Sequence, residues 1–429
     1  MAKAKSKKIT IEEALVPVEE QPYQIPDNWC WTRPLSVFDI EYGKGLPTKE
    51  LMGEGYPVFG ANGQIGYYSE YMFEKEMPLM SCRGAYSGTM NCSLPYSFVT
   101  SNSLVIKDKG CFVDYKYIFY MFSALNTDKL VSGSAQPQVT VQAFNDFAVP
   151  LPPLAEQKRI VEQIESLFSK LDEAKDKAQE VLDEFESRKA AVLHKALSGE
   201  LTKKWRLDKG INDNRKTVPL SKCCKIGSGG TPSRKIPEYY DGNIPWIKTG
   251  EINWNDIGDA EEHISQEAID NSSAKIYKPG AVLVAMYGMG ITRGRAAILK
   301  KEAATNQAVC VLQPNSDLYN KYLFYYFMCN YWEIREKSVG GNQLNLSGTI
   351  IGQFVIDIPS FEEQQRVVTI LDDIFEREMK VKEFLETILE QIDLMKKSIL
   401  AKAFHGKLGT NISEEENSIE LLKKIIEEG

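Results

Sequence analysis

The chain contains one motif twice. Residues 151–168 read LPPLAEQKRIVEQIESLF, and residues 358–375 read IPSFEEQQRVVTILDDIF. Both contain the pattern Pro-x-x-x-Glu-Gln-x-Arg-(Ile/Val)-Val, and the second copy begins 207 positions after the first. The correspondence continues without a gap to Leu201 and Leu408. An internal repeat constrains architecture more than any single residue does, so we expect two related halves.

Each copy has the hydrophobic spacing of a long helix. Apolar residues recur in steps of three and four from Ile160 to Phe185, and again from Val367 to Ile399. This spacing, with charged residues on the other face, is typical of a coiled-coil seam. A proline precedes each copy and a glycine follows it, as expected at helix ends: Pro152, Pro359, Gly199 and Gly406.

Two such helices need partners, because a solitary amphipathic helix leaves its seam in water. The nearest partner for each is the other copy. Antiparallel pairing within one chain would place a module at each end of a rod, with a pseudo-two-fold axis between the halves. A coiled coil that joins two copies of the protein is the alternative.

The segments before the helices resemble each other more weakly. Residues 115–122 (YKYIFYMF) match 320–327 (NKYLFYYF), which predicts an aromatic helix in each module. Short β-branched runs between Gly- and Pro-rich turns predict strands around it. We therefore expect an α+β chain with mixed α/β modules at 22–150 and 202–359, long helices at 151–201 and 360–408 that form an intramolecular antiparallel coiled coil, an N-terminal arm at 1–21 and an acidic tail at 409–429.

Composition restricts the function further. The net charge of −8 argues against a simple basic nucleic-acid binder, and only the 202–359 module is net basic. The eight cysteines have no metal-ligand spacing and are expected to be reduced thiols. No signal peptide and no apolar run of membrane-spanning length is found in the sequence, which predicts a cytoplasmic protein without membrane contact.

No catalytic or cofactor motif is convincing. Gly288-x-Gly290-x-x-x-Gly294 follows a strand-like run, but the acidic residue of a dinucleotide site is poorly placed and the next segment reads as a strand. Residues 225–235 lack the Gly-Lys-Ser/Thr of a phosphate-binding loop. We expect no catalytic residue, no metal and no cofactor in this chain.

Polar side chains in predicted loops are the remaining candidates. Arg, Asn and Gln can contact base edges in DNA, whereas Lys, Ser and Thr hold phosphates. Arg293 and Arg295 rank first, because they are two cations on a glycine-flanked loop. The other candidates are Thr231, Ser233, Arg234, Lys235, Lys248, Tyr287, Asn306 and Gln307 in the second module, and Lys44, Asn62, Gln64, Arg83, Tyr86, Thr89, Ser101 and Asn102 in the first.

These segments resemble a known family. VPLPPLAEQKRIVEQIESLFSKLDEA (149–174) and its second copy are similar to the helical repeats of specificity (S) subunits from type I restriction–modification systems. PYQIPDNWCWTRPLSV (22–37), GSGGTPS (227–233) and TNQAVCVL (305–312) resemble parts of the target-recognition domains of that family. The resemblance covers about 22–408, nearly the whole chain.

The resemblance implies a function for the two modules. Each would read one half of a split site in double-stranded DNA, while the coiled coil sets the gap and docks two methyltransferase subunits. Restriction/translocase subunits would join the full complex, and S-adenosylmethionine, ATP and Mg are expected only in those partners. Two alternatives stay open: a coiled-coil scaffold that does not bind DNA, and the recognition region of a split or fused restriction–methylation enzyme.

Overall fold

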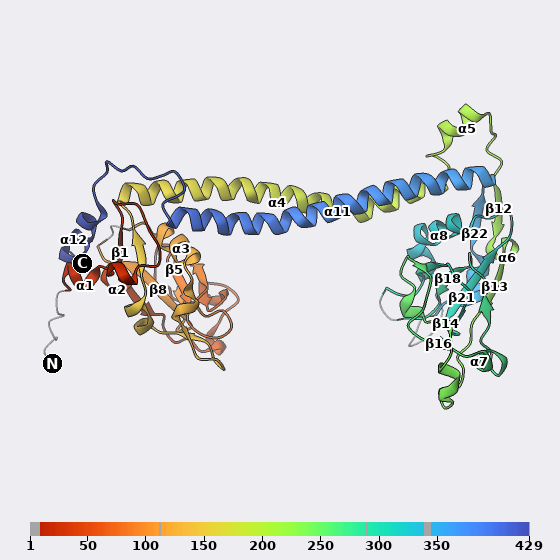
Figure 1. Cartoon of the computed structure of the whole chain (residues 1–429), viewed down its shortest axis with the longest axis horizontal. Coiled ribbons are helices and arrows are strands. Elements are labelled where there is room, and N and C mark those ends of the chain that lie inside the picture. Colours follow the sequence, from red (N-terminus) through yellow and green to blue (C-terminus); the bar gives the residue numbers. More distant parts are fainter. Residues whose placement is uncertain (1–8, 111–112, 289–290, 339–344, 429) are drawn as a thin grey trace. The chain divides into compact units, whose positions relative to one another are not determined.

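The computed structural model describes residues 9–110, 113–288, 291–338 and 345–428 (Figure 1). Its internal contacts divide the chain into two compact units. Unit 1 comprises Met1–Gln179 and Glu386–Gly429, and unit 2 comprises Glu180–Leu385. Each unit therefore contains one end of both long helices.

The repeated motif forms two long helices of equal length. Helix α4 spans Leu154–Leu197 and helix α11 spans Phe361–Phe404, as the hydrophobic spacing predicts. Gly199 and Gly406 follow them with φ of 81° and 67°. In this left-handed region glycine has no steric penalty, so it suits the end of a helix.

The two helices are antiparallel within unit 1. Lys175 Nζ lies 3.7 Å from a carboxylate oxygen of Asp393, and Asp172 pairs with Lys396. A later residue of α4 thus contacts an earlier residue of α11. The apolar side chains of Ile160 and Ile164, near the start of α4, are fully buried.

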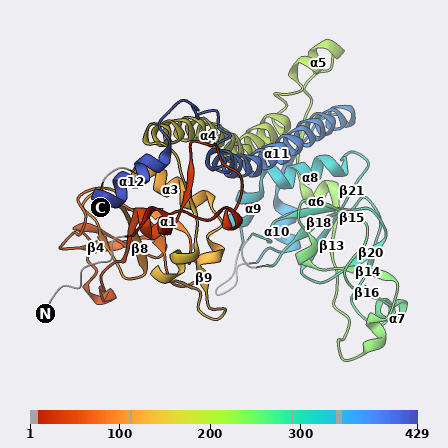
Figure 2. The ribbon, with the colours of Figure 1, turned by 60° about the vertical axis from the view of Figure 1, so that its left-hand side comes forward.

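The same direction holds within unit 2. Lys189 Nζ lies 5.8 Å from the ring centroid of Phe375, and Leu193 belongs to one buried cluster with Val367 and Leu371. Figures 1 and 2 both show α4 and α11 side by side. The predicted antiparallel pairing inside one chain is therefore confirmed.

Part of the predicted seam remains accessible. Val381 and Met395 have the expected spacing, yet they are 45% and 49% exposed. A pair of helices covers only one strip of each partner, so residues beside that strip stay open to solvent. Three further apolar residues of α11 are also exposed: Met379, Phe384 and Leu394.

Unit 1 is built around an antiparallel sheet with the strand order β2-β8-β5-β6. Helix α3, which spans Tyr115–Ala124, packs against it and confirms the predicted aromatic helix. The four strands are β2 (Phe38–Tyr42), β8 (Ser103–Asp108), β5 (Pro78–Ser81) and β6 (Met90–Cys92). Smaller elements are β1 (Cys30–Thr32) with β11 (Val149–Leu151), β3 (Tyr56–Gly60) with β4 (Gly63–Tyr68) and β7 (Phe98–Val99), β9 (Val131–Ser132) with β10 (Gln138–Val139), and α2 (Pro34–Val37).

Unit 2 has the corresponding sheet, with the order β13-β21-β18-β19-β15. Helix α8, at Asn320–Cys329, contacts it and is the second predicted aromatic helix. The strands are β13 (Cys224–Ser228), β21 (Val309–Pro314), β18 (Val282–Ala285), β19 (Ala296–Leu299) and β15 (Asp256–Ile257). A second sheet contains β16 (His263–Ile264), β14 (Ile244–Ile247), β20 (Ala303–Thr305) and β17 (Ile276–Tyr277). The remaining elements are β12 (Lys216–Pro219) with β22 (Val355–Ile358), α5 (Lys203–Lys209), α6 (Leu220–Cys223), α7 (Gln266–Asp270), α9 (Tyr331–Glu336) and α10 (Gly348–Gln353).

Segments near both ends of the chain fold onto unit 1. Helix α1 (Ile11–Ala14) begins with a capping box between Thr10 and Glu13. Helix α12 (Ser418–Glu428) lies in the segment expected as an acidic tail, and its Leu422 is fully buried. The first eight residues of the predicted N-terminal arm lie outside the described residues.

Candidate nucleic-acid interface

The pairing of the strands brings many of the candidate loops to one end of each central sheet, where neighbouring strands begin or end. In unit 1, Tyr42 at the end of β2 pairs with Leu104 near the start of β8, and Ser103 pairs with Ser81 at the end of β5. In unit 2 the same positions pair through Cys310 with Ser228 and through Val309 with Ala285. We call the segments next to these strand ends the strand-end loops. They are 43–45 and 82–89, after β2 and β5, and 100–102, before β8, in unit 1. In unit 2 they are 229–236 and 286–295, after β13 and β18, and 306–308, before β21; residues 289–290 lie outside the described residues.

Backbone hydrogen bonds join the three loops of unit 1. The Ser101 amide donates to the carbonyl of Lys44 at 3.0 Å, and the Cys82 amide donates to the carbonyl of Asn102 at 3.0 Å. Arg83 follows Cys82 directly and is exposed. The structure therefore brings the predicted residues Lys44, Arg83, Ser101 and Asn102 together.

The other candidates of unit 1 lie beside this group. Asn62 is exposed in the turn between β3 and β4, and Ser81 holds that turn by donating to the carbonyl of Ala61. Tyr86 and Thr89 lie in the 82–89 loop, where the Thr89 amide donates to the carbonyl of Tyr86 at 2.9 Å. Gln64, at the start of β4, is also exposed.

One glycine in each unit allows the loops to approach. A Cβ on Gly43 would lie 2.4 Å from the carbonyl oxygen of Thr100, and one on Gly229 would lie 1.8 Å from that of Thr305. Real Cβ atoms do not come this close to backbone. The sequence therefore needs glycine directly after β2 and β13 if the strand-end loops are to meet.

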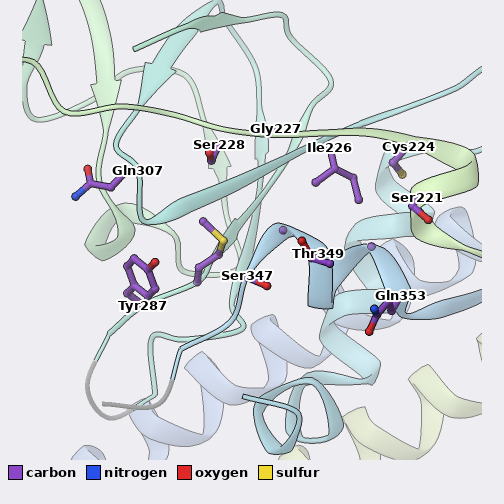
Figure 3. A pocket seen from close by; sticks show the side chains of 13 residues that line it. Ser221, Cys224, Ile226, Gly227, Ser228, Tyr287, Gln307, Ser347, Thr349 and Gln353 are labelled. Carbon is purple, nitrogen blue, oxygen red and sulfur yellow. The ribbon is translucent and has the colours of Figure 1, made fainter. Parts of the chain in front are cut away.

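Five candidates of unit 2 also lie close to one another: Thr231, Lys248, Tyr287, Asn306 and Gln307. Thr231 donates a hydrogen bond to Gln307, and the amide of Asn306 donates to the carbonyl of Ile247 at 3.0 Å, next to Lys248. Gln307 also lines a cavity of about 650 Å³ together with Tyr287. Figure 3 shows these two side chains on one side of the cavity, with Ser221 and Cys224 on the other.

Two glutamates, Glu261 and Glu262, form ion pairs with the candidate cations Arg234 and Lys248. Arg234 Nη1 lies 2.6 Å from Glu262, and Lys248 Nζ lies 2.9 Å from Glu262 and 3.2 Å from Glu261. Hydrogen bonds from Arg234 and then Lys248 hold the pKa of Glu262 below its ordinary value. In the same loop, Ser233 accepts a 3.4 Å hydrogen bond from the amide of Lys235.

Arg293 and Arg295, which the sequence ranks first, have other neighbours. Arg295 donates to the side chain of Asn253, and the carbonyl of Arg293 accepts a 2.6 Å hydrogen bond from Arg335 of α9. Burial and then the nearby charge of Arg335 lower the pKa of Arg293. These contacts therefore place Arg295 beside Asn253 and Arg293 beside α9, on partners other than Glu262.

Sequence reasoning missed the residues of α9 around them. Arg335 lies 5.2 Å from the ring centroid of Tyr331 and 5.7 Å from that of Trp332, and Trp332 is 67% exposed. The sequence signal for this helix is weak, since residues 331–337 read YWEIREK and combine two aromatic residues with two basic and two acidic ones.

Part of this region lies outside the described residues. Gly290 of the glycine motif lies outside the described residues, as does the whole 339–344 segment. Among the described residues, no three His, Cys, Asp or Glu side chains gather in a way that could hold a metal ion.

None of the described helices combines the length and the apolar character needed to span a bilayer.

Comparisons with known proteins agree on one family. The family described as "Type I restriction modification DNA specificity domain" matches residues 26–183 and 212–394. The type I restriction enzyme EcoBI specificity subunit of Escherichia coli is 24% identical over 94% of this chain and 92% of its own length. The MjaIX specificity subunit of Methanocaldococcus jannaschii is 31% identical, over 38% of this chain and 39% of its own.

Solved structures share the fold. The HsdS subunit from Thermoanaerobacter tengcongensis has a TM-score of 0.61 at 20% identity, covering 91% of this chain and all of that one. A chain from a study of complex assembly and conformational transition in the type I R-M system has a TM-score of 0.68 at 20% identity, covering 90% of this chain and all of that one.

Proposed function

This chain belongs to the family of type I restriction modification DNA specificity domains, and from that premise we propose that each unit reads one half of a two-part site in double-stranded DNA. The observation that supports this most is that both units carry strand-end loops at corresponding positions of their central sheets. Two readers on one chain give a bipartite site. We assign the recognition domains to 22–150 and 202–359.

The side chains of the strand-end loops differ between the two units. Unit 1 presents Arg83 and Tyr86, whereas unit 2 presents Arg234, Tyr287 and Gln307. Arginine and glutamine hydrogen-bond to base edges, and different residues at matching positions favour different bases. The proposed site is therefore asymmetric.

The long helices are proposed to set the gap and to dock two methyltransferase subunits. The exposed apolar residues Met379, Phe384 and Leu394 of α11 support a protein contact there, because large apolar side chains gain most when a partner covers them. Catalysis, together with S-adenosylmethionine, ATP and Mg, would belong to these methyltransferase subunits and to the restriction/translocase subunits of the full complex.

The net charge of −8 suggests that much of the phosphate neutralisation comes from partners. Alone, the protein should bind DNA weakly, and the methyltransferase subunit should tighten binding greatly. A gel-shift titration with and without that subunit measures this. Equal affinities with and without the methyltransferase subunit would contradict the proposal that partners neutralise most of the DNA phosphates.

The central test is methylation mapping in cells that express the methyltransferase with or without this chain. We expect a bipartite methylated motif only when the chain is present. Replacing the 82–89 loop by glycine and serine should alter one half of the motif, and replacing 229–236 should alter the other. Unchanged methylation without the chain would favour the scaffold that does not bind DNA.

A further inference from the structure

Arg234 of the 229–236 loop is supported by two aromatic rings. Its guanidinium carbon lies 4.0 Å from the ring centroid of Tyr240 and 5.2 Å from that of Trp246. Contacts at this distance are favourable and restrict the plane of the guanidinium. The side chain of Arg234 is nevertheless 55% exposed, so the group is oriented without being covered.

The two rings also fix the loop that carries Arg234. The Tyr240 hydroxyl donates to the carbonyl of Pro232 at 2.7 Å, and Trp246 Nε1 donates to the carbonyl of Gly230 at 3.0 Å. A Cβ on Gly230 would lie 2.3 Å from the hydroxyl of Ser273, so the loop also packs closely on its other side. The arginine therefore projects from a rigid platform.

A fixed carboxylate completes the arrangement. Glu262 Oε2 takes the 2.6 Å contact with Arg234 Nη1, while its Oε1 accepts a 2.9 Å hydrogen bond from Lys248. The backbone carbonyl of Glu262 accepts from the amide of Trp246 at 2.8 Å. The nearest approach of Glu262 is to Nη1, and a guanidinium has five N–H donors, more than one carboxylate oxygen can accept from.

Resting on the proposed function, we propose that Arg234 reads a guanine in the half-site recognised by unit 2, by donating two hydrogen bonds to its O6 and N7. Guanine presents these two acceptors side by side in the major groove, matching the arginine fork. A phosphate fits this site less well, since Glu261 and Glu262 place negative charge beside Lys248 and Arg234. A guanidinium held in one plane is suited to a base edge.

The test uses the complete complex and maps the methylated motif for Arg234→Ala, Arg234→Lys and wild type. We expect both substitutions to make one G·C position in the unit 2 half-site degenerate, with discrimination at that base falling about 10- to 100-fold. Lysine keeps the charge and lacks the fork, so it separates base reading from phosphate binding. Lys225→Ala, which removes one exposed positive charge elsewhere in unit 2, should leave the motif unchanged.

The outcomes are distinguishable from failure of the proposed function. If Arg234→Lys keeps the wild-type motif, or if Arg234→Ala weakens methylation equally at all sites without degeneracy, the guanine assignment is overturned while bipartite recognition stands. If wild-type complex shows no sequence-specific methylation, the proposed function itself fails. Arg234→Glu should abolish methylation of the wild-type site, and full methylation by that variant would also overturn the assignment.

Discussion

The hydroxyl of Thr202 donates a 2.7 Å hydrogen bond to Glu363, a residue 161 positions later. This bond joins the segment after α4 to the start of α11. Unit 1 has the counterpart, because the hydroxyl of Thr410, after α11, donates to Glu156 at the start of α4 at 3.3 Å. The Glu of each repeated motif is thus the buried acceptor for the segment that follows the other helix.

The remaining donors to the two carboxylates differ in charge. Arg206 and Arg215 contact Glu363, the second at 2.9 Å, and both side chains are largely buried. Glu156 instead accepts from two neutral donors, Trp29 at 2.7 Å and Asn411 at 2.8 Å. The same motif residue therefore belongs to an ion network in unit 2 and to a neutral network in unit 1.

Replacing Glu363 by alanine should destabilise unit 2 strongly. The change leaves two buried guanidinium groups without their main carboxylate, which costs about 3–5 kcal/mol. Urea unfolding followed by tryptophan fluorescence measures the change in the free energy of unfolding. Glu362→Ala is the matched control, since this neighbour is exposed and should change stability by less than about 0.5 kcal/mol. Similar losses for both variants would refute the network.

The arginine of the repeated motif has unequal roles. Arg159 contacts Glu415 through two nitrogens, at 2.8 and 2.6 Å, and also donates to the carbonyl of Thr410 at 3.0 Å, whereas Arg366 is exposed. Arg159→Ala should release the segment before α12, and hydrogen exchange of the 410–417 amides should accelerate at least several-fold. Arg366→Ala should leave that exchange unchanged. The prediction fails if the two variants behave alike.

The glycine after β2 should be required for recognition by unit 1. Gly43→Ala forces the new Cβ against the carbonyl of Thr100, so the loops must separate, at a cost of about 1–3 kcal/mol. We expect the unit 1 half of the methylated motif to weaken while the other half persists. Gly45→Ala is the control, because a Cβ at Gly45 meets nothing within 4 Å.

The carboxyl of Glu262 should titrate below an ordinary glutamate. Its pKa is lowered in the folded protein by hydrogen bonds from Arg234 and Lys248. The ion pairs are therefore complete above the ordinary value of about 4.3 and are lost as the pH falls through the lower folded pKa. Carbon-13 NMR of labelled glutamate measures the midpoint, which should rise in Arg234→Ala. An unchanged midpoint would show that Arg234 has no influence on this carboxyl.

Lengthening both helices should lengthen the unread gap of the DNA site. Seven residues inserted after Gln179 and seven after Leu385 add about 10 Å of helix, or about three base pairs, and nearly preserve the helical face. Methylation mapping should show unchanged half-sites and a longer gap. A change in the half-sites would contradict the proposed role of the helices.

The helices and the strand-end loops could be predicted because their signals are local. Steps of three and four residues define α4 and α11, and Gly199 and Gly406 predict their ends. Helix α12 could also have been found, since Ile419, Leu422 and Ile425 have helical spacing. The acidic composition of residues 409–429 instead favours the interpretation of this segment as a tail.

The platform around Arg234 could not be predicted. Tyr240, Trp246 and Glu262 follow Arg234 at irregular intervals, and only the pairing of β14 with β16 brings Trp246 and Glu262 together. The glycine neighbours alone favour Arg293 and Arg295 as candidates, but the contacts of these residues with Arg335 and Asn253 depend on tertiary packing. The positions of the loops therefore follow from local sequence signals, whereas the neighbours of each loop side chain depend on strand pairing and packing.

The crossed threonine–glutamate contacts decide where such a chain can be divided for engineering. A transplanted segment made of one recognition domain and the long helix that follows it would lose the threonine after the other helix, leaving the buried carboxylate of its own motif without that hydroxyl donor. Hybrids joined near Gln179 and Leu385, inside both helices, would keep each acceptor with its donor.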